Sequence, residues 1–327
     1  MCQASVLVTM YMAHCKRIMK KLFILFITLG MNITLFAQSR KYISQFSHLQ
    51  QYYNPGLTGY EGSMLRGFIR NQWAGWEGAP KTYFISAELD FGQLSGKIDP
   101  ALQGKNALGV NMFHDSYGAF SETELILAYA SRIQLSQTTN LRLGAGINYN
   151  TVRLDPSKMT IEQADDQTVS QYLGGFADMQ ILDFNLGMAL THEKYYVSFG
   201  VHNVNQGRMN SGDLFMERKP SVRIFQAGFR ERISENLLFA TNMMWRTQTD
   251  LPDNVELNIK MLMKGRFWLG AGHRIDYANN FQLGFVFSNM RLGYIYEMPM
   301  LKSYLLPNVT HEFMLTYSIF GGNSLMW

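Results

Sequence analysis

The stretch Leu141-Arg-Leu-Gly-Ala-Gly-Ile-Asn-Tyr-Asn-Thr151 decides the fold. Its apolar residues stand at every second position, and Arg142, two glycines and two asparagines stand between them. Successive side chains of a β-strand point to opposite faces of a sheet, whereas a helix repeats its apolar residues about every 3.6 positions. The stretch therefore predicts a strand with one apolar face and one polar or small face.

The same period of two recurs along most of the chain, for example in Val255–Met263 and Phe281–Phe287. We expect about 14 such strands of roughly ten residues, the length that crosses a bilayer at a tilt. The pattern favours an all-β fold, a transmembrane antiparallel β-barrel with a short N-terminal plug or tail. The predicted strands are 63–71, 81–90, 106–115, 121–135, 140–154, 181–190, 194–203, 221–232, 236–246, 255–264, 266–275, 279–288, 290–297 and 311–320.

The composition of the 327 residues agrees with this class of protein. Hydrophobic residues make up 47% of the chain, yet the mean hydropathy is only -0.11, far below that of a helical membrane protein. Charged residues make up 17%, less than the quarter or so of a typical soluble domain, and aromatic residues make up 13%. Alternating lipid-facing and lumen-facing residues would give this balance.

The lengths of the connections predict an orientation. Tight turns are expected at Ser136–Asn140, Thr191–Glu193, Ile233–Glu235, Gly265 and Asn289. Longer connections are expected at Asp155–Gln180, Val204–Pro220, Thr247–Asn254 and Met298–Thr310. With an even number of strands, every tight turn falls at one end, which is the periplasmic end of a bacterial barrel. The long connection Phe91–Lys105 is the exception at that end.

A secreted soluble all-β protein is the alternative fold. It would turn its apolar faces inward, and alternation alone does not say which face points inward. The aromatic-rich apolar face on nearly every strand favours the membrane.

The N-terminus reads as an export signal. Lys20 and Lys21 precede the apolar run 22–36, and Leu35 and Ala37 suit the −3 and −1 positions of a signal peptidase site. We predict a signal peptide over residues 1–37, of which 1–18 would be a gene extension if translation starts at Met19. The predicted domains are then an N-terminal plug or periplasmic segment over 38–62, the barrel over 63–320 and a C-terminal extension over 321–327.

Removal of residues 1–37 changes the charge balance. The whole chain has 29 Lys and Arg against 25 Asp and Glu, and the signal holds four of the cations and none of the acids. The mature chain is therefore neutral, and no nucleic-acid partner is implied. Both cysteines, Cys2 and Cys15, also lie in the signal, so the mature chain has no disulfide or thiolate chemistry.

Signals for catalysis are weak. The sequence has no Gly-x-Ser-x-Gly, no His-Glu-x-x-His and no phosphate-binding loop, and its histidines are scattered over different segments. We predict no enzyme, cofactor or metal site, with a barrel-embedded hydrolase as the alternative. Asp165-Asp166 fits a solvated loop better than a cation site, because hard cations need six or more oxygen ligands.

Charged residues on the predicted lumen face leave two possibilities open. They can line a pore, or they can pair with one another and fill a closed barrel. A barrel of about 14 strands is wide enough to need loops or a plug to close it. These residues are Arg142, Lys260, Arg274, Arg291, Glu297 and Glu312.

Two irregular stretches are candidate functional segments. In Gln45–Gly59, Asn54-Pro55-Gly56 and Gly59 mark tight turns, which suits either a tail tucked into the barrel or a partner-binding plug. Asn71–Thr82 contains two tryptophans, two glycines and a proline, which predicts a shaped loop. Its Trp73 and Trp76 fit either an aromatic belt at the membrane surface or a hot spot of a protein interface.

Several motifs of the chain follow one another as in a known family. They include Gln45-Phe46-Ser47 with Asn54-Pro55 and Gly59, then Arg70-x-Gln72-Trp73-x-Gly75-x-Glu77-Gly78-Ala79-Pro80-Lys81-Thr82, and later Tyr195–Gly200, Phe267–Gly270, Arg291–Tyr294 and His311–Leu315. At these residues the sequence resembles the PorP/SprF family of outer-membrane proteins of the type IX secretion system. The resemblance covers nearly the whole mature chain, with departures at Gly56 and in the tail beyond Phe320.

The resemblance implies a role that composition does not reveal. Members of this family act in secretion or gliding motility, and some hold a large secreted surface protein through its C-terminal sorting domain. We predict a non-enzymatic outer-membrane component of this system, whose partners are membrane lipid, such a surface protein and other secretion components. The alternative is a diffusion or uptake channel for small or hydrophobic solutes. Candidate partner-binding or family-motif residues are Asn54, Pro55, Gly59, Gln72, Trp73, Gly75, Trp76, Glu77, Gly78, Ala79, Pro80, Lys81 and Thr82.

Overall fold

The computed structural model describes residues 43–96, 105–158, 175–213, 219–249, 251–300 and 309–320. All of them belong to one compact unit, 42–327. The predicted signal peptide, the C-terminal extension and Asp165-Asp166 lie outside the described residues, so the domain boundaries stay predictions.

The described chain is built almost entirely from strands, and each predicted strand is present. The strands are β1 (Met64–Asn71), β2 (Lys81–Asp90), β3 (Asn106–Tyr117), β4 (Phe120–Gln134), β5 (Thr139–Leu154), β6 (Ala177–His192), β7 (Tyr195–His202), β8 (Met209–Gly212), β9 (Val222–Ser234), β10 (Leu237–Gln248), β11 (Leu251–Met263), β12 (Phe267–Arg274), β13 (Ala278–Phe287), β14 (Met290–Pro299) and β15 (Thr310–Ser318). The helical elements are short: η1 (Phe46–His48), α2 (Gln50–Tyr53), η2 (Pro55–Leu57), α3 (Phe91–Leu94) and η3 (Pro156–Lys158). Among the described residues, no helix combines the length and the apolar character that a membrane crossing needs.

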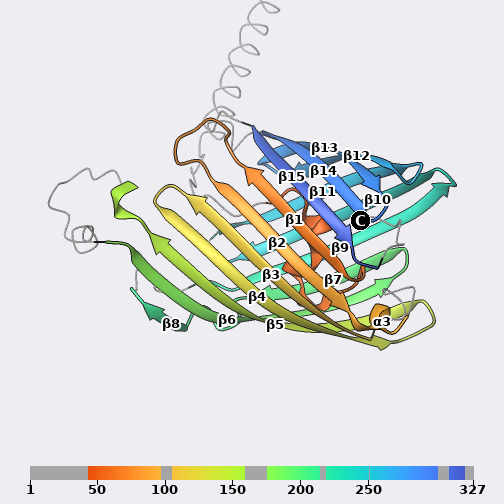
Figure 1. The fold of residues 1–327 in the computed structure, drawn as a ribbon, viewed down its shortest axis with the longest axis horizontal. Helices are drawn as coiled ribbons and strands as arrows, with labels where there is room; N and C mark the ends of the chain where they lie inside the picture. The colour runs from red at the N-terminus through yellow and green to blue at the C-terminus, as the bar shows by residue number, and fades with distance from the viewer. Residues whose placement is uncertain are drawn as a thin grey trace, which may run out of the picture. The chain divides into compact units, whose positions relative to one another are not determined.

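Fourteen of the strands close into an antiparallel barrel, which confirms the predicted fold. Neighbours in sequence pair along the sheet, β1 pairs with β15, and the additional pairing of β5 with β6 completes the ring. The β1–β15 seam is continuous, from Met64 opposite Ser318 to Asn71 opposite His311. Figure 1 shows the strands crossing the wall obliquely, as closure of a barrel requires.

The short strand β8 is an addition that the sequence analysis missed. It lies in the predicted loop Val204–Pro220 and pairs with residues 179–182 of β6, beyond the stretch of β6 that pairs with β7. Strands β7 and β8 therefore pair one after the other with the same side of β6. All four of its residues are exposed, so it carries no alternation of burial that a sequence pattern could reveal.

The two ends of the barrel differ in their connections. At the turn end, short connections join β4 to β5, β6 to β7, β9 to β10, β11 to β12 and β13 to β14. At the opposite loop end lie the longer connections 72–80, 155–176, 203–221 and 300–309. The five predicted tight turns all lie at the turn end, but three loop-end connections, 118–119, 249–250 and 275–277, are also short. The long loop predicted at Thr247–Asn254 is wrong, because β10 and β11 extend into it, with a register shift near Arg246.

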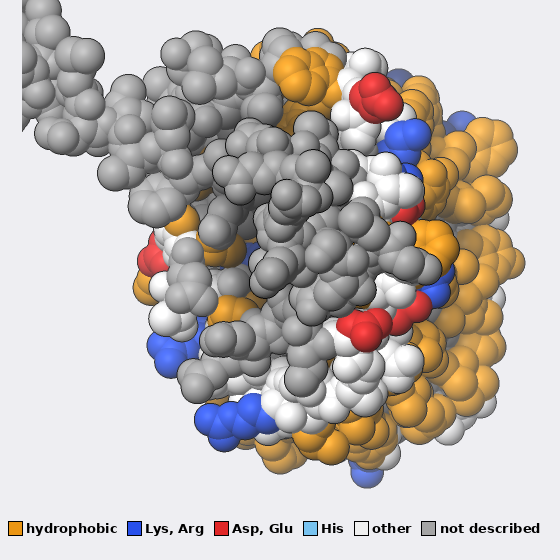
Figure 2. Space-filling view, turned by 90° about the vertical axis from the view of Figure 1, so that its left-hand side faces the viewer, with side chains coloured by type: hydrophobic (Ala, Val, Ile, Leu, Met, Phe, Trp, Pro, Cys, Tyr) orange, Lys and Arg blue, Asp and Glu red, His pale blue; other side chains and the backbone are white. Residues whose placement is uncertain are grey.

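The outer face of the wall is apolar. On β5, the outward Leu143, Ile147 and Tyr149 are exposed, whereas Arg142 and Asn148 at alternate positions are buried. A soluble barrel would reverse this arrangement, so the wall is built to face lipid. Figure 2, seen from the left-hand side of Figure 1, shows hydrophobic side chains along the wall at the right of the view.

The inner face departs from the predicted pattern of small and polar residues. Phe68, Phe84, Phe113 and Trp268 also point inward and are almost fully buried, together with residues of the N-terminal segment. The barrel thus contains a hydrophobic core. These large side chains fit the inner face because the N-terminal segment, which fills the lumen, packs against them.

Candidate functional site

The described N-terminal residues 43–62, here called the plug, lie inside the barrel. Every one of them except the half-buried Glu61 is buried. Their side chains and backbone form hydrogen bonds with residues of seven strands around the lumen: β2, β4, β6, β7, β11, β14 and β15. The structure therefore places this segment within the lumen, a position that both interpretations of it share.

The beginning of the plug is held by a buried ion-pair cluster near the loop end. The backbone N–H of Ser44 donates to Glu312 at 3.0 Å, and its hydroxyl donates to Glu297. Arg70 bridges these two carboxylates, at 2.9 Å from Glu297 and in direct contact with Glu312. Arg274 completes the cluster at 3.2 Å from Glu297 and 3.0 Å from Glu256, which lies beside it. All of these side chains are at most 7% exposed.

The middle of the plug is held by aromatic packing and by two further polar contacts. The ring of Tyr52 stacks on Phe113 with 5.4 Å between centroids and meets Phe84 edge-on at 5.6 Å. On the other side of the lumen, Lys260 donates to the hydroxyl of Ser47 at 2.6 Å and lies 5.4 Å from the centroid of the Trp268 ring. Aromatic pairs and cations over rings are both favourable in such desolvated surroundings.

The turn Asn54-Pro55-Gly56 rests directly on the wall, where three glycines face inward. Gly144 lies opposite Gly187 and Gly187 opposite Gly200, so the three glycines stand in one row across β5, β6 and β7. A Cβ atom on any of them would overlap the backbone of the plug or the Asn54 side chain. Asn54 also accepts from the backbone N–H of Gly56 at 2.8 Å and donates to the carbonyl of Met188 at 3.0 Å.

The end of the plug is fixed near the turn end. Gly59 adopts a φ of 69° and its N–H donates to Glu88 at 2.8 Å. A side chain at Gly59 would be strained in this conformation and would collide with Ala107. Arg66 contacts Glu88 and lies 2.8 Å from Glu61, so a second buried ion-pair cluster closes this end.

These contacts decide between the two possibilities for the charged lumen residues. Arg274, Glu297 and Glu312 pair within one cluster, Lys260 binds the plug, and Arg142 donates to the carbonyl of Thr58 at 3.4 Å. Each of the six predicted lumen residues is at most 6% exposed. Side chains that lined an open, water-filled pore would be exposed to it, so these residues fill the barrel.

A loop-end cluster that the sequence analysis missed connects an outer loop with the plug. Lys219, from the connection before β9, reaches inward to 2.9 Å from Glu122 and 2.8 Å from Glu124. Burial lowers the pKa of Lys219, but the two carboxylates outweigh this effect and raise it above its ordinary value. Glu124 also accepts from the Tyr52 hydroxyl at 2.8 Å. The period-two pattern of β4 could have revealed both glutamates, whereas their partner comes from a distant loop.

The Trp loop, residues 72–80 between β1 and β2, has a defined backbone. Gly78 accepts from the N–H of Gly118 at 2.9 Å, and the N–H of Ala74 donates to Val309 at 3.1 Å. Trp73 adopts a φ of 51°, in the left-handed region. The loop is therefore pinned to two neighbouring connections at the loop end. Trp76 at its tip is 51% exposed.

The structure divides the candidate motif residues by their exposure. Gly75, Trp76, Glu77, Gly78 and Lys81 are exposed, and Gln72, Trp73 and Ala79 are half-buried. Thr82 and Pro80 are buried, and the hydroxyl of Thr82 donates to Asp115 at 2.6 Å. Asn54, Pro55 and Gly59 are buried in the plug. The residues of the two motifs thus lie in different surroundings, and only the Trp loop offers side chains to a partner.

Comparison with known proteins identifies the family. The family described as type IX secretion system membrane protein PorP/SprF matches residues 35–317. This chain belongs to the PorP/SprF family. The resemblance seen in the motifs is confirmed, and this PorP/SprF protein is an outer-membrane component of the type IX secretion system. No match was found among curated proteins.

Three solved structures illustrate what this PorP/SprF protein is similar to. A structure titled CymD monoaromatic hydrocarbon channel is 11% identical over 86% of this chain and 94% of its own, with a TM-score of 0.48. The outer membrane protein Omp33 of Acinetobacter baumannii is 9% identical over 79% and 97%, with a TM-score of 0.44. A Pseudomonas aeruginosa FadL homologue is 9% identical over 78% and 90%, with a TM-score of 0.43. All three scores lie below 0.5, so these likenesses say nothing about function.

Proposed function

We propose that this protein supports the secretion or surface anchoring of one large partner protein, without enzymatic activity. In this proposal, the partner is a secreted surface protein of the adhesin or gliding type with a C-terminal sorting domain, and it binds at the loop end. Other components of the secretion system bind the same barrel. Membership of the family supports the class of partner. The exposed and ordered Trp loop supports the loop end as the place where the partner binds.

The Trp loop suits a docking surface for a physical reason. Tryptophan is enriched at the energetic centres of protein interfaces, and a loop that is already ordered loses little entropy on binding. Trp76 and Glu77 are exposed at the tip, while the backbone beside them is tied to Gly118 and Val309. The loop end would face the cell exterior, because the longer connections of bacterial barrels lie on that side.

The filled lumen favours the function of a scaffold for a partner protein and not that of a diffusion channel. The plug and the paired charges occupy the space through which a solute would pass. We expect the purified protein to remain silent in planar lipid bilayers. A steady single-channel conductance of the wild-type protein would favour the diffusion-channel alternative.

The docking proposal is tested by deletion and complementation of the gene. Deletion is expected to release one large surface protein into the medium or to stop its export, as measured by mass spectrometry of the surface and secreted fractions. Complementation with the wild type should restore the protein to the surface, whereas Trp76→Ala should restore it poorly. Trp245→Ala is the matched control, because Trp245 is 44% exposed but lies on the wall. Unchanged surface and secreted proteomes in the deletion strain would contradict the proposal.

Export behind a cleaved signal peptide is a separate part of the proposal. We expect the mature protein to begin at Gln38, after Ala37. Amino-terminal sequencing of the protein purified from outer membranes measures this directly. A mature chain that retains residues 20–37 would contradict the predicted cleavage.

A further inference from the structure

The lipid-facing wall carries a groove that neither the plug nor the Trp loop uses. The groove has a volume of about 650 Å³, within the range of small-molecule sites. It crosses six neighbouring strands, β3, β2, β1, β15, β14 and β13. Its lining is almost entirely apolar, and it lies outside the barrel, on the opposite face of the wall from the plug.

The groove follows from the register of the sheet. One row of outward side chains runs across the six strands from His114 to Leu283, and a parallel row runs from Met112 to Phe285. Members of the two rows are two residues apart on each strand, so the rows stand about 7 Å apart. Five strand spacings make the groove about 24 Å long. Its floor is the backbone between the rows.

The second row lacks one side chain at its centre. Gly67 stands there, between Ile85 on β2 and Leu315 on β15. The nearest atom to an added Cβ would be a wall carbonyl at 3.5 Å, an ordinary contact, so no packing inside the wall requires a glycine here. The missing side chain therefore widens the groove at its middle without another structural role.

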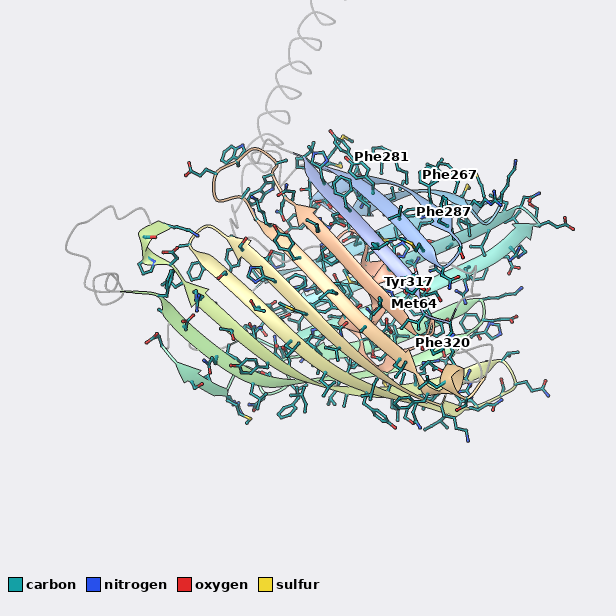
Figure 3. All side chains as sticks on the ribbon, viewed as in Figure 1. Met64, Phe267, Phe281, Phe287, Tyr317 and Phe320 are labelled. Carbon is teal, nitrogen blue, oxygen red and sulfur yellow. The ribbon has the colours of Figure 1, made fainter. Side chains whose placement is uncertain are left out.

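Two polar side chains of the lining are engaged in hydrogen bonds. His114 bonds to the hydroxyl of Thr123 at 2.8 Å, and the hydroxyl of Tyr294 lies 2.7 Å from the Nδ1 of His311. Apart from the hydroxyl of Tyr83, the rest of the lining is hydrocarbon and ring surface. Exposed apolar side chains continue from both rims over the rest of the wall, as Phe281 and Phe287 on β13 illustrate in Figure 3. The groove is thus continuous with the surface that membrane hydrocarbon covers.

From this geometry we propose that the groove is a specific seat for one acyl chain of an outer-membrane lipid. A linear chain can lie along a groove about 24 Å long, whose lining is apolar and continuous with the surface that membrane hydrocarbon covers. The seat does not depend on which secreted partner the protein serves.

Photocrosslinking tests the seat on the full mature protein purified from outer membranes. The protein is placed in nanodiscs of phosphatidylethanolamine and phosphatidylglycerol that contain a phosphatidylethanolamine with a diazirine in one acyl chain. Labelling of Ile85, Met112 and Leu315 is compared with that of Leu127 and Ile147, which are equally outward on β4 and β5. We expect the groove residues to be labelled about tenfold more strongly, which corresponds to a preference of about 1.4 kcal/mol for the groove over the open wall.

The decisive variant is Gly67→Phe, whose ring fills the middle of the groove. It is expected to remove the preference for the groove, so that groove labelling falls about tenfold. Ala145→Phe is the control, because Ala145 is an exposed outward residue on β5, and it should leave groove labelling unchanged. Heat-dependent mobility on SDS gels shows that each variant has folded, and Gly67→Leu replaces Gly67→Phe if the latter does not fold. Equal labelling of the groove and of the β4–β5 wall would overturn the proposal. Groove labelling that stays intact in both Gly67 variants would overturn it as well. A protein segment found in the groove in place of lipid would also overturn it.

Discussion

The plug turn and the Trp loop are similar in sequence but not in surroundings. Asn54–Gly59 and Gly75–Thr82 both combine glycine and proline with a few polar residues. The plug turn is completely buried against a row of wall glycines, whereas the Trp loop exposes Trp76 and Glu77 at the loop end. The same residue types thus provide a steric fit in one place and a preformed surface in the other.

The difference has an energetic consequence. Groups of the plug and the wall around it are removed from water, so a lost partner leaves a buried charge or polar atom that costs free energy. Groups of the Trp loop keep their contact with water, so their loss changes recognition more than stability. Substitutions in the plug and its surroundings should therefore lower the free energy of unfolding, whereas substitutions in the Trp loop should weaken partner binding.

Arg70→Met should have the largest effect on stability. It leaves the carboxylates of Glu297 and Glu312 buried without their bridging cation, and removal of one partner of a buried pair costs about 3–5 kcal/mol. Urea unfolding in lipid vesicles measures the free energy of unfolding. Arg153→Met is the control, since Arg153 pairs with Asp178 on the exposed wall, and it should change stability much less. Equal losses in the two variants would contradict the role of the cluster.

Gly187→Val should have the next largest effect. Its side chain would occupy the position of the Asn54 amide, and overpacking of this kind costs about 1–3 kcal/mol. Because the plug must shift, we also expect conductance in planar bilayers, where the wild type is silent. Gly67→Ala, on the outer face, is the control and should stay closed and stable. A silent and fully stable Gly187→Val protein would show that the glycine row does not fix the plug.

Asn54→Ala should have a smaller effect. The N–H of Gly56 loses its acceptor, and the carbonyl of Met188 loses its donor. Loss of a capping side chain of this type lowers the free energy of unfolding by about 1 kcal/mol. The same unfolding measurement detects the change. Asn54→Asp is the informative companion: it keeps the acceptor but buries a carboxylate beside the carbonyl of Met188, so it should destabilise the protein more than Asn54→Ala does. An unaltered stability of Asn54→Ala would mean that sterics alone position the turn.

Trp76→Ala should have the smallest effect on stability, within about 0.5 kcal/mol, because the side chain is half exposed and its loop is held through the backbone. Its effect should appear instead in the retention of the surface partner, where loss of a central tryptophan costs about 2 kcal/mol or more. Unfolding and surface proteomics on the same strain measure both. A large loss of stability would remove the distinction between the two regions.

Much of the fold was accessible from the pattern of single strands. The alternation in β5 predicted both the strand and the faces of Arg142 and Leu143, and the structure confirms them. Strand β8 was missed because it is exposed on every residue. The bounds of β10 and β11 were missed because Pro252 and the polar residues around it are typical of a turn, although both strands continue there in the ladder.

The candidate site was less accessible. The Trp loop was recognised as a shaped segment because its tryptophans, glycines and proline are adjacent in sequence. The glycine row beneath the plug was not recognised, since Gly144, Gly187 and Gly200 become neighbours only through the pairing of three strands. Lys219 was missed for the same reason, as its carboxylate partners are far away in sequence.

The sequence by itself determined the strand number, the two faces of each strand and the family, because these depend on local spacing and on short motifs. Tertiary structure alone decided that the lumen is filled and not an open pore, and that Arg70 meets Glu297 and Glu312. Closure of the ring brings β1 beside β15, and with it groups from opposite ends of the chain. Pairing of buried charges depends on that closure, and no periodicity within one strand encodes it.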